Sequence, residues 1–141
     1  MADSTKFGKK TLTTTTNKKI RIMLVDDEED ILLILRKTLE LSEFQVDTFA
    51  SSTEALSKFR PSYYNLLILD IRMPGMNGFE LFTKIRDLDS KVKVCFLTAF
   101  ETYREEFKRQ FPLLDEVKCY ITKPVSSSAL IKHVENILEL H

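Results

Sequence analysis

The sequence lacks several features, and each absence excludes a class of protein. It holds only two cysteines, Cys95 and Cys119, too few for the disulfide framework of a small secreted domain. Both lie in apolar, strand-like runs, where we expect reduced cysteines that pack as small hydrophobic side chains. No apolar run approaches the roughly 18 residues needed to span a bilayer, and the N-terminus has no apolar stretch of the signal-peptide type. We therefore expect a cytoplasmic location.

An excess of charge of either sign is also missing. Lysine and arginine together number 21, aspartate and glutamate also number 21, and the formal net charge is zero. The total therefore gives no indication of nucleic-acid or membrane binding. Apolar residues make up 43% of the 141 residues and charged residues 30%, which is the composition of one soluble domain with a sizeable core.

Residues 1–18 differ from the rest of the chain. They are polar, rich in threonine and lysine, and nearly free of large hydrophobic side chains. Such a segment buries too little apolar surface to offset the entropy lost on ordering. We expect a flexible basic tail at 1–18, followed by one domain at 19–141. We expect a plain disordered leader, with a docking or electrostatic role for the tail as the alternative.

Short apolar runs alternate with amphipathic segments from residue 19 onward. The runs predict five strands, at Ile20–Val25, Gln45–Phe49, Leu66–Leu69, Val92–Leu97 and Cys119–Thr122. The segments after them predict five helices, at 29–42, 52–59 (with Ser51 as N-cap), 77–87, 101–111 and 127–140. Nearly continuous apolar runs are typical of strands that are covered on both faces of a parallel sheet. The alternation predicts an α/β fold, a (βα)5 doubly wound parallel sheet.

Acidic residues follow two of the predicted strands at the point where each strand ends. Asp26 and Asp27 come directly after Val25, and Asp70 comes directly after Leu69. Ligands of open α/β sheets bind beyond the carboxyl ends of the strands. Two carboxylates about 4 Å apart repel by roughly 4 kcal/mol at an effective dielectric near 20, so such a cluster takes up a proton or a cation. Because Mg²⁺ prefers oxygen ligands, the pattern predicts a magnesium site.

Acidic residues near a strand end also have a simpler interpretation. They stabilise the N-terminus of a following helix through its dipole. We prefer this interpretation for Glu28, Glu29 and Asp30, which stand at the start of the helix predicted at 29–42.

Two further strand ends supply other chemistry. The run that ends at Leu97 is followed by Thr98, a hydroxyl donor, and the last run is followed by Lys123, an ammonium group. Each alone is weak evidence. Together they place a donor and a cation beside the acids, where a transferred phosphoryl group needs them.

The motifs at these four strand ends resemble those of the receiver domains of two-component response regulators. The matching segments are Leu24–Glu28 (LVDDE), Leu69–Gly78 (LDIRMPGMNG), Leu97–Ala99 (LTA) and Tyr120–Pro124 (YITKP). The resemblance covers residues 20–140. It implies a CheY-like, single-domain receiver with the flavodoxin-like strand order 2-1-3-4-5.

The resemblance also implies the roles of the acidic residues. Asp70 is similar to the aspartate that takes a phosphoryl group from a phosphohistidine. Asp27 and Asp70 are similar to direct Mg²⁺ ligands, together with the backbone carbonyl of Arg72, and Asp26 acts mostly through water. The protein would promote its own phosphorylation and dephosphorylation without being a turnover enzyme.

The same resemblance assigns the remaining site residues. Lys123 pairs with a phosphoryl oxygen, Thr98 is the switch hydroxyl that bonds another, and Tyr120 turns inward behind it. The Lys123–Pro124 peptide bond is often cis in the family. Tyr120 has a second interpretation, as an aromatic side chain that simply packs beside the strand.

The chain departs from the family pattern between the fourth and fifth strands. Thr98 and Lys123 are 25 positions apart (98 to 123), a few more than expected, and the usual Gly-Ala turn is missing. Four aromatic residues share one face of the predicted fourth helix: Phe100, Tyr103, Phe107 and Phe111. They either contact the sheet or mark a partner or dimer surface. Phe100 would also shield the phosphoryl bond from water.

The resemblance implies partners. A sensor histidine kinase or a phosphotransfer protein would donate the phosphoryl group. Because no output module follows Leu140, we expect the signal to leave through contact with an unknown protein target. The face would consist of the predicted fourth helix, the fifth strand and the fifth helix. A monomer and a phosphorylation-dependent dimer both remain open.

Three other functions fit the sequence less well. A metal-dependent phosphatase with an aspartate nucleophile needs a second acid two residues later, where this chain has Arg72. Turnover of a generic phosphate ester would support that function. A receiver that is never phosphorylated usually loses one of the acids, the threonine or the lysine. In a flavin-binding protein, the acidic stretch at 26–30 would repel the phosphate.

Overall fold

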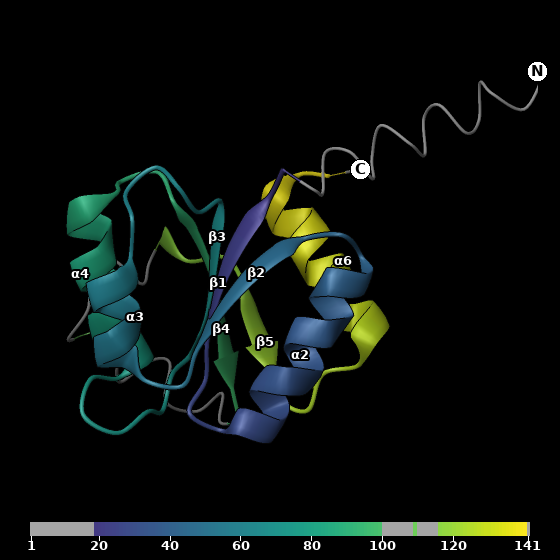
Figure 1. The fold of residues 1–141 in the computed structure, drawn as a ribbon, viewed down its shortest axis with the longest axis horizontal. Helices are drawn as coiled ribbons and strands as arrows, with labels where there is room; N and C mark the ends of the chain where they lie inside the picture. Colours follow the sequence, from purple (N-terminus) through teal and green to yellow (C-terminus); the bar gives the residue numbers. More distant parts are fainter. Residues whose placement is uncertain (1–18, 100–108, 110–115, 141) are drawn as a thin grey trace, which may run out of the picture.

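The computed structural model describes residues 19–99, 109 and 116–140. They form a five-stranded parallel sheet between two layers of helices (Figure 1). The strands are β1 (Arg21–Val25), β2 (Gln45–Phe49), β3 (Leu66–Asp70), β4 (Lys93–Thr98) and β5 (Tyr120–Thr122). The helices are α2 (Glu29–Leu41), α3 (Ser52–Lys58), α4 (Gly78–Leu88) and α6 (Ser127–Leu138). The tail predicted at 1–18 and the helix predicted at 101–111, with its aromatic series, lie outside the described residues.

The sheet has the strand order β2-β1-β3-β4-β5, and every neighbouring pair is parallel. This confirms the predicted doubly wound α/β fold and its order 2-1-3-4-5. β1 and β3 are neighbours in this order, with Val25 opposite Leu69. The residues that follow these two strands therefore leave the sheet side by side.

Both faces of the sheet are covered, which explains the continuous apolar runs. α3 and α4 lie on one face and α2 and α6 on the other (Figure 1). Side chains alternate between the faces of a strand, so in β3 Leu67 and Leu69 pack toward α3 and α4, and Leu66 and Ile68 pack toward α2 and α6. All four are fully buried.

Polar side chains fix where three of the helices begin. The Ser51 hydroxyl accepts from the Glu54 backbone N–H at the start of α3, as predicted. Asn77 and Glu80 form a reciprocal capping box at the start of α4, and Ser126 caps α6. Such caps stabilise a helix by about 1 kcal/mol each. The α4 cap also fixes the chain that leaves β3.

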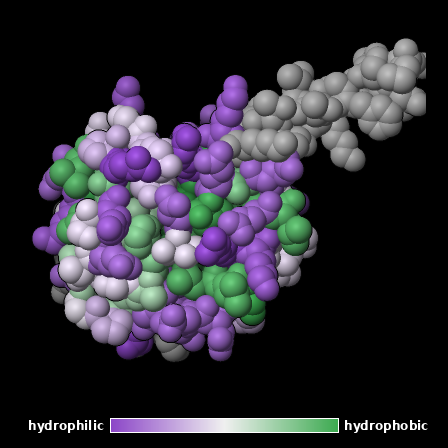
Figure 2. Space-filling model, viewed as in Figure 1, coloured by the Kyte–Doolittle hydropathy of each residue, from purple (hydrophilic) through white to green (hydrophobic). Residues whose placement is uncertain are grey.

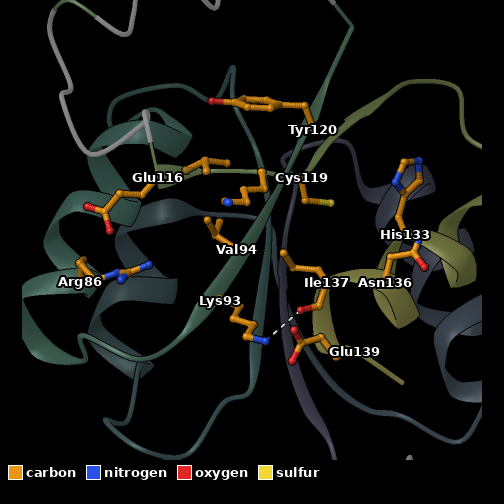
Figure 3. Close-up of a pocket in the computed structure, with 12 residues that line it drawn as sticks. Arg86, Lys93, Val94, Glu116, Cys119, Tyr120, His133, Asn136, Ile137 and Glu139 are labelled. Carbon is orange, nitrogen blue, oxygen red and sulfur yellow. Dashed lines mark hydrogen bonds between the residues drawn. The ribbon is translucent and has the colours of Figure 1, made fainter. Parts of the chain in front are cut away.

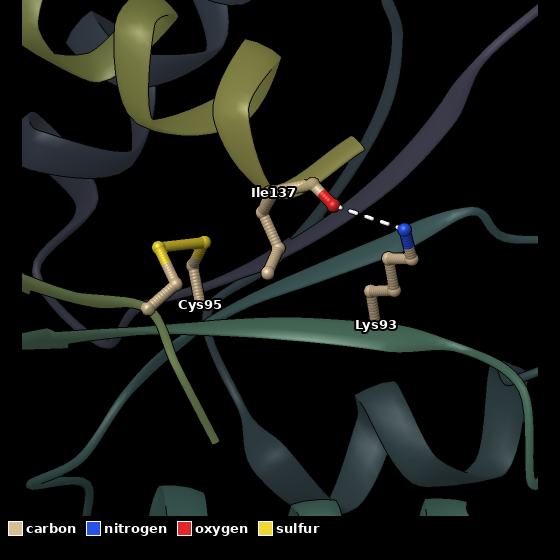
Figure 4. Close-up of a disulfide and its surroundings, with 4 residues drawn as sticks. Lys93, Cys95 and Ile137 are labelled. Carbon is tan, nitrogen blue, oxygen red and sulfur yellow. Dashed lines mark hydrogen bonds between the residues drawn. A yellow bond between two sulfur atoms is a disulfide. The ribbon is translucent and has the colours of Figure 1, made fainter. Parts of the chain in front are cut away.

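The prediction that both cysteines stay reduced is wrong. Cys95 and Cys119 form a disulfide between β4 and the residue before β5 (Figure 4). Phe96 lies opposite Tyr120 in the sheet, so the two cysteines occupy the preceding positions, with their Cα atoms 4.6 Å apart. Both side chains belong to the apolar layer under α6, so their predicted burial among hydrophobic residues is confirmed.

The surface carries no continuous apolar band in the view of Figure 2, where hydrophilic and hydrophobic side chains are interspersed. Large apolar side chains that are exposed include Leu33, Ile34 and Leu41 of α2. Within the described part of the chain, every helix is too short or too polar to cross a membrane.

Candidate functional site

Three carboxylates converge at the carboxyl end of the sheet. Asp26 and Asp27 follow β1, and Asp70 is the last residue of the neighbouring strand β3. One oxygen from each side chain lies within 4.8 Å of the others. The predicted convergence of these acids is therefore confirmed, and it follows from the parallel pairing of β1 with β3.

Asp26 is the most tightly held of the three. Its side chain is fully buried. Its Oδ1 accepts the backbone N–H of Glu28 at 2.9 Å, and its Oδ2 lies 2.7 Å from Nζ of Lys123. Its own backbone N–H donates to the carbonyl of Phe49, the last residue of β2. This carboxylate is therefore both a structural anchor and part of the acidic cluster.

Lys123 reaches into the same cluster from the end of β5. Its Nζ lies 3.1 Å from Oε1 of Glu28 and 3.5 Å from Oδ1 of Asp70, in addition to its contact with Asp26. Its backbone N–H donates to the carbonyl of Thr98 at 2.8 Å. The peptide bond to Pro124 is cis, as the resemblance implied. The ammonium group is thus placed beside the predicted phosphoryl acceptor.

The electrostatic balance of the cluster is negative. The cluster holds four carboxylates, those of Asp26, Asp27, Glu28 and Asp70, and one ammonium group, which contacts three of them. Burial raises the pKa of Asp70 to about 7, and the charges of Asp26 and Asp27 add to this effect, whereas Lys123 opposes it. For Lys123, burial lowers the pKa, but the hydrogen bond to Asp26 and the charges of Asp70 and Asp26 outweigh burial and raise it.

This donor set fits a hard divalent cation. Carboxylate oxygens are the ligands that Mg²⁺ prefers, and Mg²⁺ usually takes one or two of them with water. A divalent charge would also offset the surplus negative charge that raises the pKa of Asp70. Arg72 lies in the loop directly after β3, so its backbone belongs to the same edge of the sheet. The role of its carbonyl as a ligand stays a prediction.

The two predicted switch residues lie on the neighbouring strands β4 and β5. Thr98 ends β4 at the same edge as Asp70, which pairs with Leu97, and its side chain is buried. Tyr120 begins β5 opposite Phe96, and the two rings stack at 5.8 Å. Tyr120 therefore lies on the side of the sheet that faces α4, where it packs against the apolar core. Its movement on phosphorylation stays a prediction.

Two residues have a larger part in the site than the sequence indicated. Glu28 occupies the N-cap position of α2, where an acid at the start of this helix was expected, but its side chain makes no cap hydrogen bond and pairs with Lys123. Gly78 begins α4, and a Cβ atom there would overlap the backbone carbonyl oxygen of Asp70. The motif contains Gly78, but the sequence gives no sign of this close approach. Glu29 and Asp30 do lie in the first turn of α2, as predicted.

Known proteins are similar to this chain in both sequence and fold. The sequence model of the family described as response regulator receiver domain matches residues 22–135. The chain is 34% identical over 104 residues to the regulatory protein VanRB of Enterococcus faecalis, which covers 74% of this chain and 46% of VanRB. It is 35% identical over 98 residues to the C4-dicarboxylate transport transcriptional regulatory protein DctD of Rhizobium meliloti, which covers 70% of this chain and 21% of DctD. The chain thus spans less than half the length of these two relatives.

Solved receiver structures match over nearly their whole length. The non-phosphorylated HemR receiver domain from Leptospira biflexa is 31% identical, with a TM-score of 0.76 over 87% of this chain and 97% of that chain. The response regulator TrrA from Thermotoga maritima, in complex with Mg²⁺ and BeF, is also 31% identical, with a TM-score of 0.71 over 84% and 98%. The sequence matches the family model, the fold is that of solved receiver domains, and the acidic residues lie at the carboxyl edge of the sheet. The chain therefore belongs to the receiver-domain family of two-component response regulators.

Proposed function

We propose that this chain is a phosphorylation-dependent signalling switch whose acceptor is Asp70. The phosphoryl donor is a phosphohistidine on a sensor histidine kinase or on a phosphotransfer protein. Asp26, Asp27, Asp70 and the backbone carbonyl of Arg72 hold Mg²⁺, with Asp26 acting mostly through water. The output is a change in a protein-binding surface. The chain acts as a phosphoacceptor and does not turn over a substrate.

One observation carries this proposal. Three carboxylates lie within 4.8 Å of one another, and the ammonium group of Lys123 lies 3.5 Å from Oδ1 of Asp70. A nucleophilic oxygen, ligands for a hard cation and a point charge for a phosphoryl oxygen are thus together at one edge of the sheet. The TrrA structure holds Mg²⁺ with BeF, and we propose that the same pair of reagents binds this cluster.

The transfer uses the residues as follows. A carboxylate oxygen of Asp70 forms a bond to phosphorus while the bond from phosphorus to the histidine nitrogen breaks. The electron pair of that bond stays on the imidazole nitrogen. Lys123 offsets negative charge on a phosphoryl oxygen, and the hydroxyl of Thr98 donates to another. Mg²⁺, when bound, supplies further charge neutralisation for the weak carboxylate nucleophile.

The response runs through the strand pair β4–β5. Thr98 and Tyr120 are the residues that move on phosphorylation. The hydrogen bond from the backbone N–H of Lys123 to the carbonyl of Thr98 couples the ends of the two strands. β5, α6 and the helix predicted at 101–111 form the face that a downstream protein reads. Phosphorylation shifts the equilibrium between two arrangements of this face.

Labelling with a small phosphodonor tests the acceptor. In the presence of Mg²⁺, phosphoramidate should add one phosphoryl group to the wild-type protein, as measured by intact-protein mass spectrometry. Asp70→Asn should abolish the labelling because the amide is not a nucleophile. Asp87→Asn is the matched control, since Asp87 is an exposed residue of α4 outside the cluster. Normal labelling of Asp70→Asn would show that the acceptor is another residue.

Titration with Mg²⁺ followed by NMR tests the metal site independently. Amide resonances of residues 26–28 and 70–72 should shift in the wild-type protein and saturate. Asp27→Ala should require at least about tenfold more Mg²⁺, because one direct ligand is lost. Lys123→Ala should leave Mg²⁺ binding largely intact but reduce the shifts that beryllofluoride induces at Thr98 and Tyr120. Unchanged Mg²⁺ binding in Asp27→Ala would exclude this residue as a ligand.

A further inference from the structure

The Cys95–Cys119 disulfide lies in the same strand pair as the site but away from it. The pairing of β4 with β5 runs from Phe96 opposite Tyr120 to Thr98 opposite Thr122. The disulfide closes the start of this short ladder, and the acidic cluster adjoins its end. The backbone N–H of Phe96 donates to the carbonyl of Cys119, so the cross-link and the first rung of the ladder share residues.

The two cysteines differ in their access to solvent. Cys95 is completely buried, whereas Cys119 keeps 6% of its surface exposed. Cys119 also lines a cavity of about 630 Å³. In Figure 3 its side chain extends in the direction of α6, which carries His133. Because Cys119 and not Cys95 lines this cavity, a nucleophile that reaches the disulfide through it meets Cys119 first.

The cavity has the size and charge for a small anionic molecule. Pockets of 300–1,000 Å³ typically hold small organic ligands. Three basic residues line it, Arg86, Lys93 and Lys118, and two acidic ones, Glu116 and Glu139. The formal balance is one positive charge. Lys93 Nζ donates to the carbonyl of Ile137 at 3.0 Å (Figures 3 and 4), while Lys118 is exposed at the rim beside Cys119.

We propose that the Cys95–Cys119 pair is a site of reversible thiol–disulfide exchange with an anionic low-molecular-weight thiol, and that its oxidation state sets how freely β4 and β5 move. The thiolate of the small molecule attacks Sγ of Cys119, and Cys95 leaves as a thiolate that takes up a proton. A second small thiol then attacks the mixed disulfide and releases Cys119 as a thiol. In sum, one protein disulfide and two small thiols give two protein thiols and one small disulfide.

Packing explains why the exchange would affect the strands. A disulfide holds its sulfur atoms about 2.05 Å apart, whereas non-bonded heavy atoms approach to only about 3.5–4 Å. Reduction thus pushes two buried sulfur atoms apart in a layer that also contains Leu97, Ile121 and Leu130 of α6. Close-packed interiors absorb such a change by moving an element. The element with the shortest ladder at this place is β5, with three residues.

The location adds a reason to expect exchange. In the cytoplasm, where the sequence leads us to expect this protein, disulfides in proteins of ordinary stability are mostly catalytic or redox-sensing. The coupling to switching rests on the proposed function, because it concerns Thr98 and Tyr120. The exchange itself does not rest on it, and the two are tested by different measurements.

Thiol counting on the wild-type protein tests the exchange. Native protein treated with oxidised glutathione should have no thiols that react with an aromatic disulfide reagent. After native incubation with excess reduced glutathione it should have two, and removal of glutathione under oxidising conditions should return the count to zero. Two free thiols under every native condition would overturn the proposal. So would a disulfide that glutathione reduces only after denaturation, because it would then be purely structural.

Rates of reduction test access through the cavity. Lys118→Glu reverses a charge beside Cys119, so reduction by glutathione, an anion, should slow by about 3- to 10-fold at low ionic strength. Reduction by dithiothreitol, which is neutral, should change less than about twofold. Lys132→Glu is the matched control, because Lys132 is exposed on α6 outside the cavity lining. Equal effects of the two variants, or an equal slowing with both reductants, would overturn this route.

NMR separates the coupling from the proposed function. Reduction should shift and broaden amide resonances of 96–98 and 120–122 in protein that has no phosphodonor, Mg²⁺ or beryllofluoride. The spectrum of the Cys95→Ala/Cys119→Ala variant should resemble that of the reduced wild-type protein. It should not change when reduced or oxidised glutathione is added. Unchanged resonances of β4 and β5 would overturn the coupling. If Asp70→Asn still accepts a phosphoryl group but exchange occurs as described, only the proposed function fails.

Discussion

The two ends of the strand pair β4–β5 are held by different chemistry. At the carboxyl end, Lys123 donates its backbone N–H to Thr98 and its ammonium group contacts Asp26 and Asp70. At the amino end, a covalent bond joins Cys95 to Cys119 inside an apolar layer. The ladder between these two ends has only three paired positions.

The difference shows which conditions each end senses. The charged end holds more carboxylates than cations, so its stability depends on pH and on divalent cations. The two cysteines do not titrate while the disulfide is intact, so the bond at the covalent end depends on the supply of thiols. One short strand pair can therefore receive two chemically independent inputs.

Removal of the ammonium group should have the largest effect on stability. Lys123→Met leaves the fully buried Asp26 without its positive partner. Loss of one member of a buried ion pair costs about 3–5 kcal/mol. Urea denaturation at pH 7 without divalent cations should show this loss, and added Mg²⁺ should restore part of it. Lys37→Met, on the exposed face of α2, should stay within about 0.5 kcal/mol of wild type.

A loss of less than about 1 kcal/mol in Lys123→Met would show that Lys123 acts as an ordinary surface charge. The carboxyl end would then depend on the backbone bond between Lys123 and Thr98 and not on the ion pairs.

Removal of the disulfide should have the next largest effect. The bond spans 24 positions of the chain, and closing a loop of this length stabilises the folded state by about 3 kcal/mol. Cys95→Ala/Cys119→Ala should lose about that much free energy of unfolding. Added Mg²⁺ should not change the loss of stability in this double variant, whereas it should reduce the loss in Lys123→Met. A Mg²⁺-dependent loss would contradict the independence of the two ends.

The sequence predicted the charged end better than the covalent end. Asp26, Asp27 and Asp70 each end a continuous apolar run, and the alternation of strands and helices places those ends at one edge. The cysteine pair depends on the register between β4 and β5. The predicted order made these strands neighbours, but nothing local shows that Phe96 lies opposite Tyr120, which aligns the two cysteines.

The contribution of Glu28 was missed for a similar reason. An acid before a helix looks the same in sequence whether it caps that helix or pairs across the site. Its contact with Lys123 joins residues 95 positions apart, and only the folded chain brings them together. The roles of Arg72 and Tyr120 stay predictions, and Phe100 lies outside the described residues.

The pH dependence should sharpen the contrast between the two ends. The folded-state pKa of Asp70, about 7, lies above its unfolded value of 3.8, so the folded protein binds this proton more tightly. Without divalent cations, the free energy of unfolding should therefore fall as pH rises from about 4 to 7, by about 3 kcal/mol. Asp70→Asn should remove most of this decrease, and saturating Mg²⁺ should reduce it.

The disulfide provides the control for this measurement. In Cys95→Ala/Cys119→Ala the free energy of unfolding should decrease with pH by the same amount as in the wild-type protein, but from a lower starting value. A flat pH profile for the wild-type protein would show that the pKa of Asp70 is not raised by its surroundings, and that the acidic cluster carries less repulsion than its geometry indicates.

Two glycines that follow β3, one in the loop and one at the start of α4, give the smallest effects and test how the acceptor is positioned. Gly75 has a positive φ of 76°, but a Cβ atom there would meet open space, so Gly75→Ala should cost about 1 kcal/mol from backbone strain alone. At Gly78 the added Cβ overlaps the carbonyl oxygen of Asp70, so Gly78→Ala must displace either β3 or the start of α4. It should cost about 2 kcal/mol and slow phosphoramidate labelling, whereas Gly75→Ala should label at the normal rate. Equal labelling rates would mean that the acceptor tolerates movement of its backbone, and that the charges around Asp70, more than the packing beneath it, set its reactivity.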